Sequence, residues 1–420
     1  MAATKDEKVS TNIPHDLVFN ILSKLPIKSL KRFSCITPSW ADLFENPNFM
    51  TMYYHNFFRK NDHDTSSILL KQGIPDTYKD NLFMLYGERF ENKVKFDWPP
   101  PFQGNDIGCI YKLGSIINDT ICVYPRISCG TQFDQKVILW NLSSNELKGI
   151  RYGYVPCPPG IHFMIALHGF GYDKFTNDYK LIRRIDYLQD NSFWNDVRVD
   201  PPMPSWELYS LKSNSWKKLD VEIPYDESYD HVYLNGMCHW WGCTTYNEEE
   251  SVLVSFNLSD EVVYTTLVDW NGCHATQNRA LMVMNDSIGM ITMHEGNTCF
   301  EISILGELGV KESWTKIFKI GPLSCVAYPF GVWYKGKIFF HKDDGEIAWF
   351  DLSTRVLEEI GIKGYNHNGS STINPKPISL VTNRILFKHP PSTPQLAVNF
   401  VMHFPSFPAI SQYILVVARS

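Results

Sequence analysis

The sequence lacks the features of several large protein classes. Its first twelve residues are polar and carry both signs of charge, so they contain no apolar run of the length that a secretory signal needs. The formal net charge of the 420-residue chain is −6. This disfavours general nucleic-acid binding, because that activity needs a basic surface that displaces counterions from phosphates. We therefore expect an intracellular protein, cytoplasmic or nuclear, with protein partners and no nucleic-acid partner.

The common signatures of catalytic and metal sites are also missing. The sequence contains no HExxH, no GxSxG, no phosphate-binding loop and no CxxC pair among its 10 cysteines. Cys238, His239 and Cys243 are close in sequence, but Cys238 and His239 should point to opposite faces of a strand. We expect reduced, mostly buried cysteines, and we expect no metal, no cofactor and no catalytic residue.

An apolar periodicity typical of short helices runs between residues 13 and 60. Pro14 suits the first turn of a helix, and apolar residues recur at helical spacing as far as Leu25, before Pro26 ends the run. The pattern predicts two further short helices and then a linker helix over residues 51–65. These helices are more apolar than a segment of about 45 residues can bury by itself. They must bind a partner or pack on the rest of the chain.

From about residue 66 the pattern changes to short alternating strands separated by polar turns. Five strand–turn–strand units have register residues spaced by 69, 47, 48 and 46 positions, namely Trp140, Tyr209, Phe256, Ile304 and Phe350. A partial sixth unit lies over residues 82–98. Such a period is typical of propeller blades. The expected fold class is α+β by segment, with a small N-terminal three-helix domain followed by an all-β, kelch-like β-propeller of five or six blades. A β-sandwich is the alternative.

The helical segment resembles the F-box of large plant families. The resemblance rests on an aliphatic-Pro opening, a Leu-Pro turn, an Arg-Phe pair and a Cys-to-Trp spacing, carried by Ile13-Pro14, Leu25-Pro26-Ile27-Lys28-Ser29-Leu30, Arg32-Phe33, and Cys35 with Trp40. One departure is Thr37-Pro38, which replaces the more usual Cys/Ser-Lys pair.

The β-rich region resembles the F-box-associated domain that accompanies such F-boxes. The matching runs are residues 169–180, 209–216, 234–240 and 309–314. Among relatives it is most similar in character to the S-locus F-box-like group. The expected domains are an F-box at 10–50, a linker helix at 51–65, an F-box-associated, propeller-like recognition domain at 66–364, and a divergent tail at 365–420.

The resemblance implies a non-catalytic subunit of an SCF-type ubiquitin ligase. In such a complex the F-box binds a Skp-family adaptor, the adaptor binds a cullin scaffold, and the β domain holds a protein target for ubiquitination and proteasomal degradation. The implied adaptor-binding residues are Ile13, Pro14, Leu17, Ile21, Leu25, Pro26, Ser29, Leu30, Phe33, Cys35 and Trp40. The alternative is a glycan- or small-ligand-binding propeller with a non-degradative role.

Residues 219–278 contain eleven acidic residues and no Lys or Arg. This composition is typical either of an ordinary solvated surface or of a negative patch that attracts a basic protein target. Aromatic residues in nearby predicted loops could anchor that target. The predicted substrate-binding residues are Trp194, Tyr225, Asp226, Glu227, Tyr229, Glu248, Glu249, Glu250, Trp270 and His274.

The tail contains no Asp, Glu, Lys or Arg between residues 390 and 418. Its length would permit a membrane anchor, but Pro405, Pro408 and several polar residues disfavour one. Residues 413–418 are a strand candidate that would pair the last blade with the first and so close the propeller. A tail of unrelated sequence from an altered gene model is the alternative.

Overall fold

The computed structural model describes most of the β-rich region and parts of the two ends. The described residues are 15–25, Ser29, Phe33, Ile36, 38–46, Phe49, Met52, 67–73, 80–86, Phe90, 92–99, Phe102, 110–125, 136–142, 144–158, 160–189, 200–224, 230–243, 251–268, 279–284, 286–293, 299–323, 325–333, 336–363, 379–385 and 415–419.

Short helical segments occupy the N-terminal region, namely α1 (His15–Leu22), α3 (Pro38–Ala41) and the 3-10 helix η1 (Asp42–Glu45). Leu22, Leu43 and Phe49 form a small buried cluster between them. A complete three-helix arrangement is not seen, because much of residues 26–65 lies outside the described part of the chain. Segments α3 and η1 lie where the third helix was predicted, while the predicted second helix and the linker helix stay predictions.

Five four-stranded antiparallel sheets follow one another along the chain, and we number them blades 1 to 5. Blade 1 contains β4 (Ile110–Ile117), β5 (Thr120–Pro125), β6 (Lys136–Asn141) and β7 (Leu147–Arg151). Blade 2 contains β8 (Ile161–Asp173), β9 (Asp178–Gln189), β10 (Ser205–Ser210) and β11 (Ser215–Leu219). Blade 3 contains β12 (His231–Leu234), β13 (Met237–Cys243), β14 (Ser251–Asn257) and β15 (Val263–Leu267).

The remaining strands complete the ring. Blade 4 contains β16 (Arg279–Met284), β17 (Ser287–Met293), β18 (Phe300–Leu305) and β19 (Trp314–Ile320), with the 3-10 helix η3 (Lys311–Ser313) before β19. Blade 5 contains β20 (Val326–Trp333), β21 (Lys337–Lys342), β22 (Glu346–Asp351) and β23 (Val356–Lys363). The two ends of the chain supply β1 (Ser67–Gly73), β2 (Asp80–Tyr86), β3 (Asn92–Phe96), β24 (Ser379–Ile385) and β25 (Leu415–Arg419).

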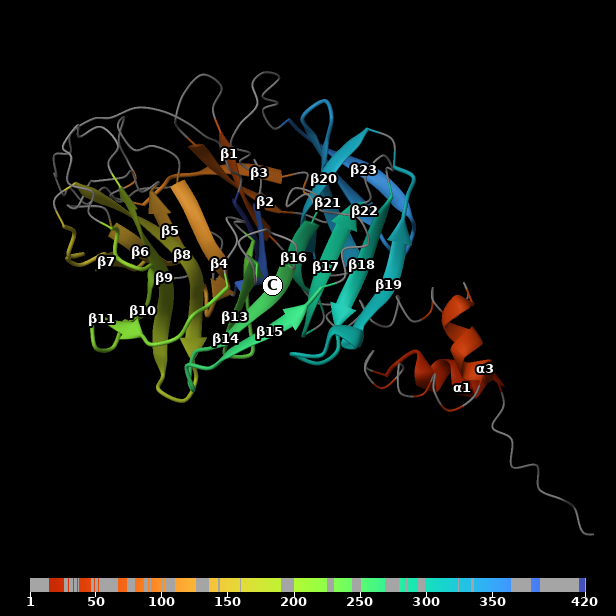
Figure 1. The fold of residues 1–420 in the computed structure, drawn as a ribbon. Coiled ribbons are helices and arrows are strands. Elements are labelled where there is room, and N and C mark those ends of the chain that lie inside the picture. Colours follow the sequence, from red (N-terminus) through yellow and green to blue (C-terminus); the bar gives the residue numbers. More distant parts are fainter. Residues whose placement is uncertain are drawn as a thin grey trace, which may run out of the picture.

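The first strands of blades 1 to 5, together with β24, form a closed inner ring. In the order β4, β8, β12, β16, β20 and β24, each strand contacts the next, and β24 contacts β4 again. β25 pairs with β24 in parallel and lies beside β1, so the sixth blade combines strands from both ends of the chain. Figure 1 shows this ring of sheets, with the N-terminal helices outside it beside β19. The predicted all-β propeller is confirmed and has six blades.

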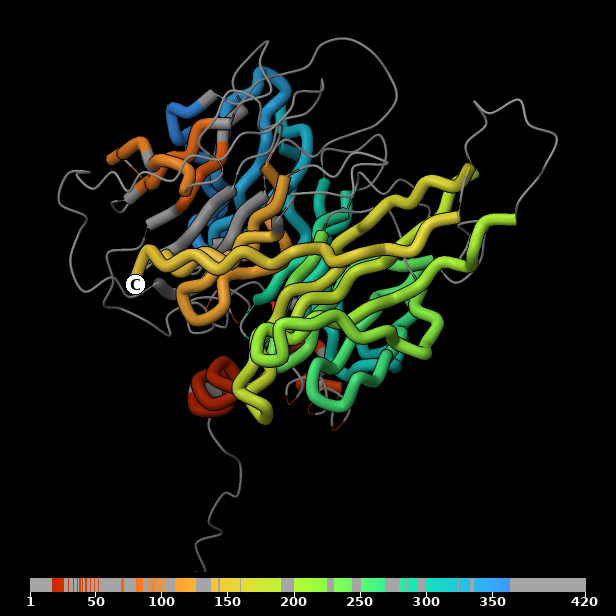
Figure 2. The backbone as a smooth tube through the Cα atoms, turned by 90° about the vertical axis from the view of Figure 1, so that its left-hand side faces the viewer, coloured from red at the N-terminus to blue at the C-terminus, as the bar shows by residue number. Residues whose placement is uncertain are grey.

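The predicted repeat corresponds to the third strand of each blade. Trp140, Tyr209, Phe256, Ile304 and Phe350 lie on β6, β10, β14, β18 and β22. The wide first interval arises because blade 2 begins with the long hairpin β8–β9, whose strands of 13 and 12 residues span about 40 Å at the usual rise per residue. Figure 2 shows this hairpin in yellow.

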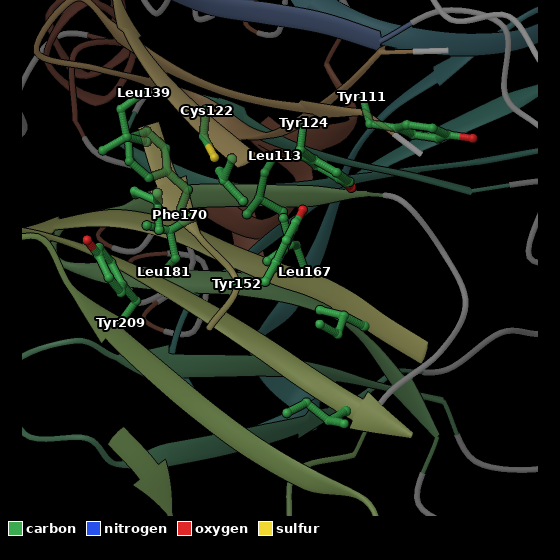
Figure 3. Packing of buried hydrophobic residues seen from close by; sticks show 14 of the residues in the cluster. Tyr111, Leu113, Cys122, Tyr124, Leu139, Tyr152, Leu167, Phe170, Leu181 and Tyr209 are labelled. Atoms are coloured by element: carbon green, nitrogen blue, oxygen red, sulfur yellow. The ribbon is translucent and has the colours of Figure 1, made fainter. Parts of the chain in front are cut away.

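A large apolar core lies between blades 1 and 2. It joins residues of β4 to β7 with residues of β8 to β10, including Leu113, Phe170, Leu181 and Tyr209. Figure 3 shows these side chains converging from strands that are far apart in the sequence. Burial of apolar area at about 25 cal/mol per Å² makes such an interface a main contribution to propeller stability.

The run at residues 169–180 locks blade 2 to blade 3. A Cβ atom added at Gly171 would overlap Leu258 Cδ1 and lie 2.8 Å from the Tyr233 ring, so a larger residue would require these side chains of blade 3 to shift. The carboxylate of the fully buried Asp173 pairs with Lys180 Nζ at 2.9 Å and accepts a hydrogen bond from Ser259 Oγ at 2.6 Å. Lys180 Nζ also donates to the carbonyl of Leu258 at 2.7 Å. The residues of this run therefore hold blades together.

Residues 379–385, within the segment predicted as a divergent tail, form β24, an inner strand. Of the six cysteines that the structure describes, Cys122 and Cys238 are buried, three are partly buried and Cys325 is exposed, so most of these six are not buried. The proposed closing strand overlaps β25, and its role in closing the propeller stays a prediction.

Candidate adaptor-binding and substrate-recognition surfaces

Helix α1 has one buried side and one exposed apolar side. Val18 and Leu22, one turn apart, pack into the F-box cluster of Leu22, Leu43 and Phe49. Leu17 and Ile21, also one turn apart, are 53% and 55% exposed. The helix therefore presents an adjacent aliphatic pair to solvent, which is costly unless another surface covers it.

Other predicted adaptor-binding residues lie closer to the cluster. Leu25, Phe33 and Trp40 are partly buried against it, and the Phe33 and Trp40 rings meet edge to face with centroids 5.5 Å apart. Ser29 is partly buried. The remaining predicted residues lie outside the described part of the chain, namely Ile13, Pro14, Pro26, Leu30 and Cys35.

Ile36 is a further candidate for the adaptor-binding surface. Its side chain is 60% exposed, more than that of Leu17 or Ile21. The sequence analysis did not single it out as an adaptor-binding residue. Exposure in the folded structure is the property that distinguishes it.

Among the described residues, Phe318 packs against the F-box cluster from the propeller. It lies on the last strand of blade 4 and is partly buried. In Figure 1 the helices lie beside β19, at the opposite end of the propeller from β7 and β11. A partner bound to the exposed side of α1 would therefore leave blades 1 and 2 accessible.

The predicted substrate-binding residues all fall outside the described part of the chain, namely Trp194, Tyr225, Asp226, Glu227, Tyr229, Glu248, Glu249, Glu250, Trp270 and His274. The flanking strands are described. In an antiparallel meander, the connections after the second and fourth strands leave at the same end of the sheet. The second and fourth strands of blades 2 and 3 end at Gln189, Leu219, Cys243 and Leu267. These four strand ends therefore lie on one face of the propeller.

The described acidic residues of the sequence 219–278 do not all lie on one face of the propeller. Asp260 and Glu261 follow β14, the third strand of blade 3, so they lie at the opposite end of the sheet from Cys243. Glu261 also forms an ion pair with Lys217 of blade 2 at 2.7 Å. Acidic residues that are close in sequence therefore lie on opposite faces of the propeller. Lys217 from blade 2 also neutralises the charge of Glu261.

Polar groups gather where the inner strands begin. Lys112 lies on β4 and Asp230 precedes β12, and these two strands are in contact. Burial lowers the pKa of Lys112 to about 7, while the negative charge of Asp230 acts in the opposite direction. The Asp230 carboxylate accepts a hydrogen bond from the backbone N–H of Leu281 at 3.3 Å, which links blade 3 to blade 4.

The cysteine–histidine pair considered for zinc is divided between two environments. Cys238 packs in the apolar cluster between blades 2 and 3 with Trp206 and Trp240. His239 points to the other face of β13, where its Nδ1 lies 2.8 Å from Ser255 Oγ. Among the described residues, no group of three or more His, Cys, Asp or Glu side chains could hold a metal ion. In that same part of the chain, no helix has the length and apolar character to cross a membrane.

Comparison with known families and proteins gives consistent matches. A family model described as "F-box associated beta propeller domain" matches residues 127–374, and one described as "F-box domain" matches residues 10–51. The F-box protein CPR1 of Arabidopsis thaliana is 22% identical, with 84% of each chain covered. The F-box/kelch-repeat protein At3g23880 of the same plant is 23% identical, covering 76% of this chain and 82% of the relative.

Solved structures give weaker likenesses. An uncharacterized protein, lmo1340 of Listeria monocytogenes, is 11% identical and covers 70% of this chain and 79% of its own, with a TM-score of 0.35. A likeness of this size carries no functional argument. The family matches show that the predicted resemblance is correct.

Proposed function

Because the chain belongs to the family of F-box proteins with an F-box-associated β-propeller, we propose that it is the substrate-recognition subunit of an SCF-type ubiquitin ligase. In this proposal the F-box binds a Skp-family adaptor and, through it, a cullin scaffold. The propeller holds a protein target for ubiquitination and degradation, in the cytoplasm or nucleus. The chain contributes position, and other subunits supply the covalent chemistry.

The observation that carries this proposal is the exposed aliphatic pair on α1. Leu17 and Ile21 project from the side of α1 that faces away from the F-box cluster, while Val18 and Leu22 hold the helix in place. Apolar anchors at the centre of a protein interface typically contribute 2 kcal/mol or more each. An adaptor that covers the pair would remove this surface from water without disturbing the propeller.

The proposal is tested with Leu17→Ala/Ile21→Ala in the full chain. Alanine preserves the helix, so the variant should fold as the wild type does. We expect adaptor affinity to fall by about 2 to 4 kcal/mol, or roughly 30- to 1,000-fold. Co-purification with the adaptor and cullin should therefore be lost.

The matched control is Asn20→Ala/Lys24→Ala, which removes two exposed polar side chains from the same segment. It should bind the adaptor like the wild type. Equal binding by both double variants would contradict the proposed adaptor surface.

A further inference from the structure

A cleft of about 670 Å³ lies between blades 1 and 2, within the size range of protein ligand sites. One wall is formed at the end of blade 1 by Lys148, Gly149 and residues 151–154. The other is formed by residues of β9, β10 and β11, including Arg183, Glu207 and Trp216. None of these residues belongs to the predicted adaptor or substrate sets.

Hydrogen bonds and stacking fix the blade 2 wall of the cleft in position. The guanidinium carbon of Arg183 lies 3.9 Å from the centre of the Trp216 ring, and the Arg183 side chain donates hydrogen bonds to Glu207 and to the carbonyl of Tyr152. Trp216 Nε1 donates to the carbonyl of Arg151 at 3.0 Å, across the boundary between the blades. A ligand therefore meets an aromatic surface whose position is already fixed, which lowers the entropic cost of binding.

The charge that remains available in the cleft is positive. Glu207, the acidic residue among the described lining residues, forms an ion pair with Arg183. Lys148 and Arg151 are both exposed, and neither has an ion-pair partner among the described residues. Two open cations beside an aromatic wall suit a ligand that carries carboxylate groups next to an apolar group.

Three features favour a peptide as that ligand. β7 pairs with β6 on one side, and no described strand pairs with its other side, so backbone groups remain for an extended chain. Tyr154 is 76% exposed at the rim, where aromatic residues commonly anchor protein partners. Strands β7 and β11, which border the cleft, also lie far from the F-box helices (Figure 1), so adaptor and ligand can bind together.

We propose that this cleft between blades 1 and 2 is a docking site for an acidic peptide segment that contains an aromatic or large aliphatic residue. This inference rests on the proposed receptor function and names the chemistry of its target. It differs in sign from the sequence-based prediction of a basic target. The carrying features are the open cations Lys148 and Arg151 and the fixed Trp216 ring.

The test is selection of a phage-displayed library of random nine-residue peptides on the full chain. We expect enrichment of sequences with Asp or Glu beside Phe, Tyr, Trp or Leu. The best peptide, made with a fluorescent label, is then titrated against the variants and followed by fluorescence anisotropy. Lys148→Glu/Arg151→Glu should lower its affinity by about tenfold or more, because it places like charges against the ligand.

The matched control is Lys95→Glu/Lys174→Glu, which makes the same change in net charge at two exposed lysines outside the cleft. It should change the affinity by less than about twofold. Three outcomes would overturn the proposal: enrichment of basic peptides, no enrichment at all, or equal losses in both double variants. Adaptor binding, measured on the same samples, should be unchanged in both variants. If the wild-type protein does not bind the adaptor, that result contradicts the proposed function. The peptide measurements would still test the docking site.

Discussion

Removal of the Asp173 carboxylate should destabilise the propeller more than removal of its lysine partner. The carboxylate accepts hydrogen bonds from the hydroxyls of Thr176 and Ser259, both at 2.6 Å, and from the backbone N–H of Phe175 at 3.0 Å, in addition to its ion pair with Lys180. The side chain of Asp173 is fully buried. The substitution Asp173→Asn would leave the largely buried Lys180 ammonium facing an uncharged amide.

The magnitude follows from the burial of both partners. Removing one member of a buried ion pair typically costs about 3 to 5 kcal/mol, because the other charge stays buried and unpaired. The substitution Lys180→Met leaves the carboxylate with its hydrogen bonds from Phe175, Thr176 and Ser259, so its cost should be smaller, about 1 to 3 kcal/mol. A loss at the upper end is a large fraction of the roughly 5 to 15 kcal/mol that usually stabilises a folded domain.

The assay is urea unfolding followed by tryptophan fluorescence, for the wild type, both single variants and the double variant. The double variant should be more stable than the two single losses added together would give, since the two groups interact directly. The reasoning would be refuted if Lys180→Met cost as much as Asp173→Asn, or if Asp173→Asn cost less than about 1 kcal/mol.

The same carboxylate gives a dependence on pH. Burial by itself would raise the pKa of Asp173, but hydrogen bonds from Ser259, Thr176, Lys180 and Phe175 outweigh burial and hold the pKa well below its ordinary value. Its contribution to stability is therefore complete above the unfolded value, about 3.9, and is lost as the pH falls below it. Acid should cost the wild type more stability than it costs Asp173→Asn.

Three further predictions concern other parts of the fold. Gly171→Ala should cost about 1 to 3 kcal/mol in thermal unfolding, since its Cβ would overlap Leu258 Cδ1. Burial lowers the pKa of His239 to about 3, so its contribution is present above about pH 6.5 and is lost as the pH falls towards 3. His239→Asn, which can still bond Ser255, should flatten the stability profile over that interval. Phe318→Ala should speed amide hydrogen exchange in the F-box helices and in blades 4 and 5, and leave blades 1 and 2 nearly unchanged, because Phe318 packs against both the F-box cluster and the core of blades 4 and 5.

The sequence predicted the blades well because each blade repeats a local pattern. The third-strand register residues, from Trp140 to Phe350, stand out by apolar alternation alone. The Asn235-Gly236 pair also predicted a tight turn, and both residues have positive φ angles, of 50° and 84°.

Strand β24 was missed for a different reason. Residues 379–385 have no hairpin partner next to them in sequence, and their contacts are with β25, β20 and β4, which are distant in sequence. The sequence around a strand does not show which distant strands it will contact, so the position of β24 in the inner ring could not be predicted locally.

The cleft between blades 1 and 2 was missed because its residues are scattered. Trp216 lies in one of the family-like runs, but its partner Arg151 is 65 residues earlier. The composition of one sequence window also does not show which charges pair on the folded surface, since Glu261 meets Lys217 from another blade. Charge on a folded surface depends on which blades adjoin, and a window along the chain does not contain that information.

The central claim, that the exposed side of α1 binds a Skp-family adaptor, is tested most directly by hydrogen–deuterium exchange of the full chain with and without the purified adaptor. The account predicts slower exchange in peptides that cover residues 15–25, where Leu17 and Ile21 would be covered, and unchanged exchange in blades 1 to 3. No protection of residues 15–25 at a saturating adaptor concentration, or protection confined to the propeller, would contradict it.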